Sequence, residues 1–169
     1  MKKNLILTGM MGVGKTTLGK ALSILLKMKF IDTDAEIEKI ESDTINNIFK
    51  NKGEDYFRTI EREICLKFAK RPNSIIALGG GAIVNKEIRD FILKECITFW
   101  LDIDLKILRK RLINSKKRPL LNDDDMTKKI TDIYEKRKII YNLAKFKITC
   151  GNKDSIELTK EIKQIYEKN

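Results

Sequence analysis

The residues best suited to chemistry are the eight at positions 9–16, which read GMMGVGKT. They match the pattern G-x-x-x-x-G-K-[ST] of a phosphate-binding loop and directly follow the apolar run 5–7. Such a loop turns its backbone N–H groups, with the N-terminus of the next helix, toward one anion. Lys15 can then reach the β- and γ-phosphates, and the Thr16 hydroxyl is placed to ligate Mg²⁺. The match therefore favours a loop that binds a nucleoside triphosphate over an ordinary glycine turn before a helix.

Two carboxylates follow the short apolar segment 30–31. Asp32 and Asp34 are separated by one residue, so in an extended segment their side chains point the same way. Beside a phosphate site, such a pair can divide its work between Mg²⁺ and an acceptor hydroxyl. The alternative is a solvated pair that caps a helix, because Asp34 opens a helical pattern. The position after a strand in a phosphate-loop protein favours the functional interpretation.

An arginine between two glutamates is a further candidate. At helical spacing Arg58 can pair with Glu54 four residues earlier and with Glu61 three residues later. Held in this way, its planar fork suits a carboxylate or a phosphate. The spacing alone, however, favours a surface ladder of ion pairs.

Glycine and arginine mark two more loops. Three consecutive glycines, 79–81, follow the apolar run 75–78, which favours close approach of a ligand to the backbone over a simple tight turn. Arg118 lies in the charged segment 115–126, which we expect to be a mobile loop. An arginine on such a loop can close onto a transferring phosphoryl group and exclude water, although basic loops are usually only solvated.

Composition limits the available chemistry. The 169 residues include no histidine, which excludes a Ser-His-Asp or Cys-His nucleophile and leaves a carboxylate, lysine, tyrosine or water as general base. Cys65, Cys96 and Cys150 are far apart and fit neither a disulfide framework nor a zinc site, so we expect buried thiols. The net charge of +11 is spread along the chain without interleaved aromatic residues, which favours small anions over nucleic acid. Without a membrane span or signal sequence, we expect a cytoplasmic protein.

The elements that must position these residues alternate between extended and helical patterns. We expect strands at 5–8, 30–31, 75–78, 97–101 and 146–149. We expect helices at 15–27, 35–41, 44–51, 54–69, 86–94, 104–114 and 127–144, and a final one from 155. This order predicts one α/β domain, 1–169, with a central five-stranded parallel sheet between helices in a three-layer sandwich. The strand ends would bring the loops 9–16, 32–34 and 79–81 to one crevice.

Together these motifs resemble those of the shikimate kinase family, and the resemblance covers nearly the whole chain. The matching segments are G-x-M-G-x-G-K-[ST]-T at 9–17, D-T-D at 32–34, G-E-x-x-F-R-x-x-E at 53–61, G-G-G at 79–81, R-P-L-L at 118–121 and R-x-x-x-Y at 137–141. The resemblance implies a P-loop kinase fold of the nucleoside-monophosphate-kinase type. It also implies Mg²⁺-assisted, ATP-dependent phosphorylation of the 3-hydroxyl of shikimate, in the route to chorismate and the aromatic amino acids.

The resemblance further implies roles for individual residues. Asp34, as candidate base for the attacking hydroxyl, would be catalytic together with Lys15 and Arg118. The nucleotide-binding set would be Gly12, Val13, Gly14, Lys15, Thr16, Thr17, Arg111 and Arg118, with Arg111 stacked on adenine. The shikimate-binding set would be Asp34, Phe49, Phe57, Arg58, Glu61, Gly80, Gly81 and Arg137, with both arginines on the carboxylate. Thr16 and Asp32 would hold Mg²⁺, the latter through water.

The same resemblance implies a lid at about 112–126 and a shikimate-binding helical segment at about 33–61. We expect a monomer whose partners are ATP and shikimate, with no nucleic acid and no membrane. Two alternatives stay open. A related small-molecule P-loop kinase, such as gluconate kinase, would share the phosphate loop. A basic P-loop nucleic-acid-binding module would bind polynucleotides in a salt-sensitive way, but it leaves the D-T-D and G-G-G segments unexplained.

Overall fold

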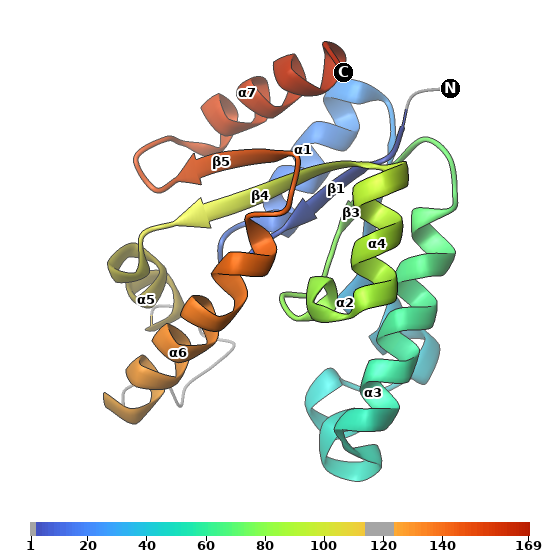
Figure 1. Cartoon of the computed structure of the whole chain (residues 1–169), viewed down its shortest axis with the longest axis vertical. Coiled ribbons are helices and arrows are strands. Elements are labelled where there is room, and N and C mark those ends of the chain that lie inside the picture. Colours follow the sequence, from blue (N-terminus) through green and yellow to red (C-terminus); the bar gives the residue numbers. More distant parts are fainter. Residues whose placement is uncertain (1–2, 114–123) are drawn as a thin grey trace.

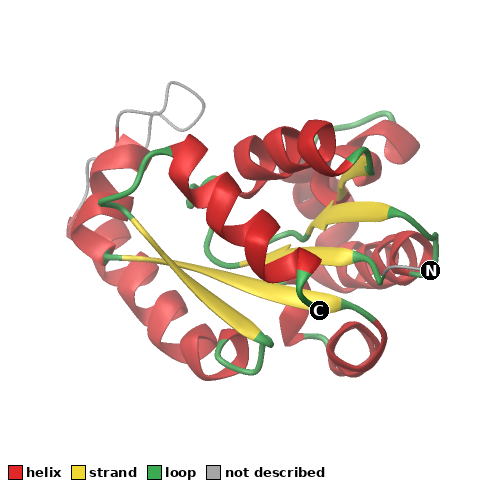
Figure 2. Cartoon of the chain, turned by 90° about the horizontal axis from the view of Figure 1, so that it is seen from above, coloured by secondary structure: helices red, strands yellow, loops and turns green. Residues whose placement is uncertain are grey.

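A five-stranded parallel sheet forms the centre of the chain, in a computed structural model that describes residues 3–113 and 124–169. The strands are β1 (Leu5–Thr8), β2 (Lys29–Asp32), β3 (Ser74–Ala77), β4 (Ile97–Ile103) and β5 (Phe146–Cys150), in the spatial order β2-β3-β1-β4-β5. The helices are α1 (Lys15–Leu26), α2 (Thr33–Glu41), α3 (Ile45–Ala69), α4 (Lys86–Glu95), α5 (Leu105–Ile113), α6 (Asp124–Tyr141) and α7 (Ser155–Glu167), with a 3₁₀ turn η1 (Ala82–Val84). Helices cover both faces of the sheet, which confirms the predicted three-layer architecture (Figures 1 and 2).

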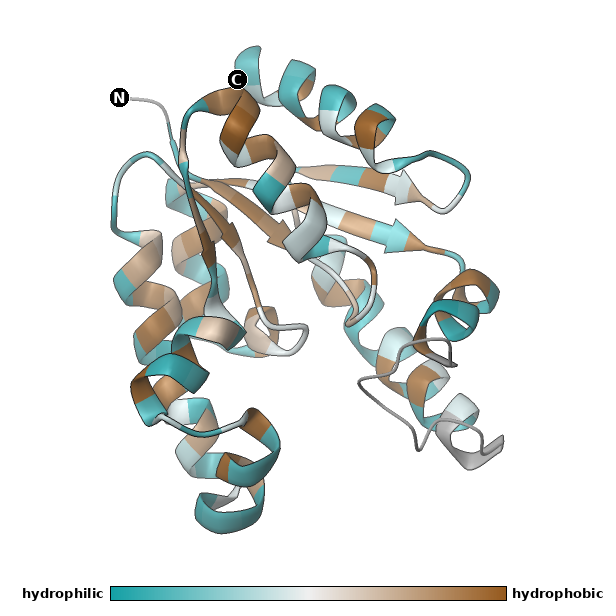
Figure 3. Cartoon of the chain, turned by 180° about the vertical axis from the view of Figure 1, so that it is seen from behind, coloured by the Kyte–Doolittle hydropathy of each residue, from teal (hydrophilic) through white to brown (hydrophobic). Residues whose placement is uncertain are grey.

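The core lies along the central strands. Leu5, Ile6 and Leu7 of β1 are fully buried, because β1 pairs with β3 on one side and β4 on the other and is covered on both faces. Continuous apolar runs are typical of such strands. Apolar residues follow the sheet and the inner faces of the helices, whereas the outer helix faces are hydrophilic (Figure 3). All three cysteines are free and buried, as predicted.

The register of the strands brings their carboxyl ends to one edge. Ala77 of β3 lies opposite Leu7 of β1 and opposite Asp32 of β2. The loops that leave these strands therefore begin level with one another, as the predicted crevice requires. On one side of this edge α2 and the start of α3 project beyond the sheet, and on the other side α5 and α6 do (Figure 1).

The structure corrects several predicted boundaries. The segment 32–34 is not extended throughout, because α2 begins at Thr33 and the Asp32 side chain caps it. The helices predicted at 44–51 and 54–69 run together as α3, but Gly53, at φ 84°, breaks the helical backbone between them. Residues 124–126, predicted as loop, belong to α6, which begins at Asp124. The rest of the predicted loop, 115–123, lies outside the described residues.

The described part of the chain contains no helix with the length and apolar character needed to cross a membrane.

Candidate functional site

The phosphate-binding loop joins β1 to α1 in the predicted way. Three of its glycines have positive φ: 137° at Gly9, 78° at Gly12 and 108° at Gly14. A Cβ at Gly12 would lie 2.8 Å from the Leu112 side chain, so this turn has no room for another residue. Gly14 caps α1 without a side-chain hydrogen bond, and the first turn of α1 carries no acidic residue. The first N–H groups of α1 are thus open to an anion.

Lys15 lies folded against the loop. Its Nζ donates to the carbonyl oxygens of Gly9 at 2.8 Å and Met10 at 2.9 Å. Burial lowers the pKa of Lys15 to about 8, although the nearby carboxylates of Asp34 and Asp32 oppose this shift. A cation held by neutral carbonyls gains stabilisation when an anion arrives. Lys15 is therefore suited to receive a phosphate.

A hydroxyl and a carboxylate meet beside the loop. Thr16 donates from Oγ1 to Oδ2 of Asp32 at 2.6 Å, while Oδ1 of Asp32 accepts from the N–H groups of Asp34 at 3.2 Å and Ala35 at 3.4 Å. Asp32 is thus a helix cap, as one of the two interpretations expects, and also contacts the phosphate loop. Its role toward Mg²⁺ stays a prediction. Thr16 and Asp32, with Thr17 and Lys15, line a cavity of about 470 Å³ at the loop.

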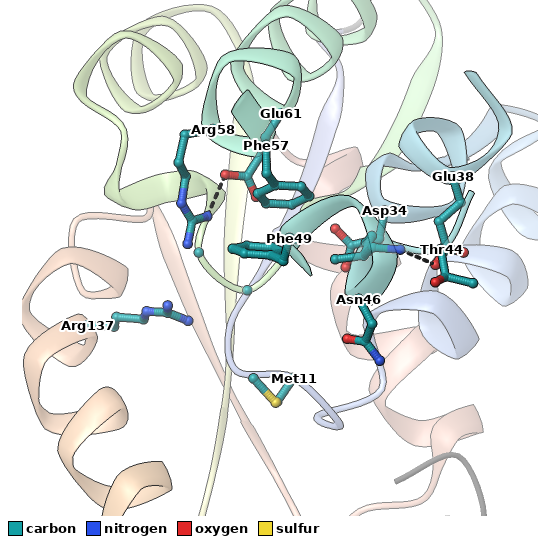
Figure 4. Close-up of a pocket in the computed structure, with 14 residues that line it drawn as sticks. Met11, Asp34, Glu38, Thr44, Asn46, Phe49, Phe57, Arg58, Glu61 and Arg137 are labelled. Carbon is teal, nitrogen blue, oxygen red and sulfur yellow. Dashed lines mark hydrogen bonds and ion pairs between the residues drawn. The ribbon is translucent and has the colours of Figure 1, made fainter. Parts of the chain in front are cut away.

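A second cavity, of about 550 Å³, opens beside the first (Figure 4). It is lined by Met11, Asp34, Glu38, Thr44, Ile45, Asn46, Phe49, Phe57, Arg58, Glu61, Gly79, Gly80, Gly81 and Arg137. The rings of Phe49 and Phe57 form an apolar wall, with centroids 4.5 Å apart. All of the residues that the resemblance places around shikimate line this cavity, although they come from α2, α3, the loop after β3, and α6.

Arg58 is held by the two predicted glutamates. Its Nη1 donates to Glu61 at 2.7 Å, and its Nε and Nη2 donate to Glu54 at 3.2 and 3.0 Å. Glu61 is only 2% exposed, and its burial raises its pKa while the Arg58 guanidinium opposes that rise. A buried carboxylate therefore fixes the guanidinium at the cavity, which is more than a surface ladder of ion pairs would do.

Two guanidinium groups converge on the glycine segment. A Cβ built at Gly81 would lie 2.9 Å from Nη1 of Arg58 and 3.4 Å from Nη2 of Arg137. Arg137 reaches this point from α6, on the opposite side of the cavity from α3 (Figure 4). Two planar cations directed at one place can bind a carboxylate from two sides.

Asp34 lies where the two cavities meet, and it lines both of them. Burial and, after it, the neighbouring Asp32 raise its pKa to about 6, while Lys15 opposes the rise. A Cβ at Gly79 would lie 2.4 Å from Oδ1 of Asp34, so only glycine leaves space for this carboxylate. A carboxylate with such a pKa is mostly ionised at neutral pH and can accept a proton.

Several residues lining the second cavity were not identified from the sequence. Met11 lies inside the phosphate-loop motif and Gly79 inside the glycine segment, so their motifs already contained the signal. Ile45 and Asn46 carried no signal, because only the packing of the start of α3 brings them to the cavity. Glu38 and Thr44 flank them across the turn from α2 to α3.

Two arginines predicted on the nucleotide side have different outcomes. Arg111, near the end of α5, donates from Nη1 to the carbonyl oxygen of Val13 at 3.3 Å, so it lies beside the phosphate loop. Arg118, and with it most of the predicted lid 112–126, lies outside the described residues. The roles of both arginines stay predictions.

Comparisons with known proteins agree with this geometry. A family model for shikimate kinase matches residues 11–167. A shikimate kinase of Rippkaea orientalis is 40% identical over 148 residues, which cover 88% of this chain and 79% of that protein. The structure of the Acinetobacter baumannii shikimate kinase in complex with shikimate covers all of this chain, with a TM-score of 0.92 and 33% identity, and 95% of that chain is covered. A gluconokinase from Sinorhizobium meliloti is only 12% identical at a TM-score of 0.59, with 98% of this chain and 94% of that chain covered, so it shares the fold alone.

Proposed function

The chain belongs to the shikimate kinase family, and we propose that its two adjoining cavities hold the two substrates of this ATP-dependent kinase. The reaction moves the γ-phosphate of ATP to a hydroxyl of shikimate. We assign ATP to the cavity at the phosphate loop and shikimate to the cavity between α3 and α6. In this assignment the predicted segment 33–61 supplies much of the acceptor site.

On the nucleotide side, the phosphate loop binds the triphosphate through its N–H groups, and Lys15 moves from its two carbonyl partners to the β- and γ-phosphates. Thr16 and Asp32 fit Mg²⁺, because a hydroxyl and a carboxylate oxygen 2.6 Å apart are the hard ligands that this ion prefers. Within the described residues, no cluster of three acidic, cysteine or histidine side chains competes for that role. When bound, Mg²⁺ neutralises charge on the phosphate oxygens.

On the acceptor side, Arg58 and Arg137 bind the carboxylate of shikimate, and the rings of Phe49 and Phe57 pack against its carbon skeleton. These contacts direct the 3-hydroxyl toward Asp34, which accepts the proton as the bond to phosphorus forms. Catalysis then depends mainly on placing the two substrates in line, since phosphoryl transfer needs little covalent help from the protein. Arg118 is proposed to reach the phosphates from a lid at 112–126.

The observation that carries this proposal is the position of Asp34, which lines both cavities and has a raised pKa. Release of ADP should be measured with shikimate and, as the comparison acceptor, with gluconate. We expect release of ADP that depends on shikimate. Phosphorus NMR of the product should show the phosphate at position 3. Turnover with gluconate alone would contradict the assignment of the acceptor cavity.

We also propose that the enzyme acts as a monomer in the cytoplasm, where ATP is available and its three free thiols stay reduced. Sedimentation equilibrium tests the monomeric state, and fractionation of cells tests the location.

A further inference from the structure

The glycine segment 79–81 has no side chains of its own with which to hold its shape. Glycine has the widest range of backbone conformations. The N–H groups of Ala82 and Val84 donate to the carbonyls of Gly79 and Gly81 at 3.0 Å, but these bonds close only the turn that follows and do not tie the segment to α2 or α6. Support from those helices must be accurate here, because the acceptor cavity, Asp34 and both guanidinium groups lie against this loop. Two buried hydroxyl groups provide such support from opposite sides.

The first hydroxyl belongs to Thr33, the middle residue of the D-T-D segment. Thr33 is fully buried, and its Oγ1 donates to the carbonyl oxygen of Ala77 at 3.3 Å. The same oxygen accepts from the N–H of Gly79 at 2.9 Å. Thr33 therefore ties the start of the glycine segment to the first turn of α2. Asp34 is the next residue, so the bond also sets the spacing between the glycine backbone and the carboxylate.

The second hydroxyl belongs to Tyr141, the last residue of α6. Tyr141 is also fully buried, and its hydroxyl donates to the carbonyl oxygen of Gly80 at 2.6 Å. Arg137 lies one helical turn earlier on the same helix, so this bond sets the spacing between the glycine backbone and the second guanidinium. The Tyr141 ring packs against the Trp100 ring at a centroid distance of 6.0 Å, and this packing limits the motion of Tyr141.

These two bonds use the N–H of Gly79 and the carbonyl of Gly80. Within the described chain, the N–H groups of Gly80 and Gly81 have no hydrogen bond of their own. The loop is thus anchored through the Gly79 N–H and the Gly80 carbonyl, and the N–H groups of Gly80 and Gly81 are left for a ligand.

We propose that Thr33 and Tyr141 are positioning residues for shikimate: together they hold the glycine segment at the distance from Asp34 and Arg137 that the acceptor requires. The proposal rests on the assignment of shikimate to this cavity. Neither residue lines the acceptor cavity. Thr33 acts through the backbone that it holds, whereas Tyr141 acts both through the Gly80 carbonyl and through its hydrogen bond with the Arg137 guanidinium.

Substitution of Thr33 tests the first anchor. Thr33→Val keeps the shape of the side chain and removes the hydroxyl with its hydrogen bonds to Ala77 and Gly79, so we expect KM for shikimate to rise about fivefold to tenfold. KM for ATP should change less than twofold, and Thr33→Ser should restore the shikimate KM. Thr98→Val is the matched control, because the buried Thr98 hydroxyl accepts a backbone N–H from Lys145 at 2.8 Å, far from the cavity.

Substitution of Tyr141 tests the second anchor on another element. Tyr141→Phe should raise the shikimate KM by a similar factor. Tyr134→Phe is its matched control on the same helix, because the Tyr134 hydroxyl donates to Asp102 at 2.8 Å and touches no glycine. Control and test variants all lose the hydrogen bonds of one buried hydroxyl, so all should lower the melting temperature. Only the test variants should change the shikimate KM.

The outcomes separate the proposal from the function on which it rests. Normal shikimate KM values in folded Thr33→Val and Tyr141→Phe, with only stability lowered, would overturn the positioning role and leave the kinase function intact. If Thr33→Val does not fold, Tyr141→Phe alone decides. A wild-type enzyme that releases no ADP with shikimate would overturn both the function and the proposal.

Discussion

The two halves of the active site are built in different ways. The nucleotide half is formed mainly by one short run of backbone, 9–16, between a strand and its helix. The acceptor half is formed by side chains from α2, α3 and α6, whose members Asp34 and Arg137 are far apart in the sequence. A phosphate site can therefore be encoded locally, whereas recognition of the acceptor depends on the whole fold. We expect changes in the acceptor half to alter specificity and turnover while leaving ATP binding intact.

The largest effect is expected where the two halves meet. Asp34→Asn removes the proposed proton acceptor but keeps the size of the side chain, so kcat should fall by about 10² to 10⁴. Binding of ATP, measured by calorimetry, should persist because the phosphate loop is unchanged. Asp55→Asn, an exposed carboxylate on α3, is the control and should keep full activity. Near-normal turnover of Asp34→Asn would remove Asp34 from its proposed role.

The next effect should be confined to the acceptor half. Arg58→Ala removes one of the two cations on the carboxylate, so KM for shikimate should rise about 10- to 100-fold, as expected for a charged hydrogen bond. KM for ATP should stay within twofold. The control is Arg62→Ala, because Arg62 lies one turn further along α3 and pairs with Glu87 outside the cavity. An equal rise in both KM values would contradict the separation of the halves.

The two halves should also titrate separately. With its pKa raised to about 6, Asp34 is protonated below that pH, so kcat/KM for shikimate should fall about tenfold for each further pH unit. With its pKa lowered to about 8, Lys15 of the free enzyme loses its charge above that pH, so kcat/KM for ATP should fall on the alkaline side. Initial rates from pH 5 to 9.5, with each substrate varied in turn, measure both limbs. A single limb shared by both substrates would argue against two independent groups.

The smallest effect concerns stability. The pKa of Asp34 rises from 3.8 to about 6 in the folded chain, so the folded state binds this proton more tightly than the unfolded state. Its contribution to the free energy of unfolding therefore falls as pH rises from about 4 to 6. At pH 7 the ionised, buried carboxylate should cost about 3 kcal/mol. Asp34→Asn should thus melt higher than wild type at pH 7, and this advantage should shrink at pH 4. An equal advantage at both pH values would contradict the linkage.

The same contrast explains how much could be predicted from the sequence. Three features follow from local spacing, and the structure confirms them. They are the phosphate loop, the order of helices and strands along the chain, and the pairing of Arg58 with Glu54 and Glu61. The boundaries at Thr33 and Asp124 were wrong. The capping side chain of Asp32 starts a helix at Thr33, where the pattern suggested an extended segment, and α6 begins at Asp124, inside the predicted loop.

The acceptor cavity itself could be predicted only through the resemblance. No local rule brings Arg137 and Arg58 to Gly81, because that meeting depends on how α3 and α6 pack on the sheet. The same holds for Ile45 and Asn46, and for the hydroxyl of Tyr141, which meets Gly80 from another part of the chain. The motif contained Tyr141, but its partner became visible only in three dimensions.

The packing of Trp100 on Tyr141 has an optical consequence. The chain has one tryptophan, so its tryptophan fluorescence, excited at wavelengths that tyrosine absorbs weakly, comes from a single, known place. Trp100 is only 2% exposed, and Lys147 Nζ lies 4.5 Å from its ring centroid. Its indole packs on the Tyr141 ring, and the Tyr141 hydroxyl bonds the carbonyl of Gly80, which lines the acceptor cavity. A ligand that shifts the Gly80 carbonyl would change the wavelength or the intensity of this emission. The protein therefore carries an intrinsic fluorophore with which ligand binding can be followed without a label.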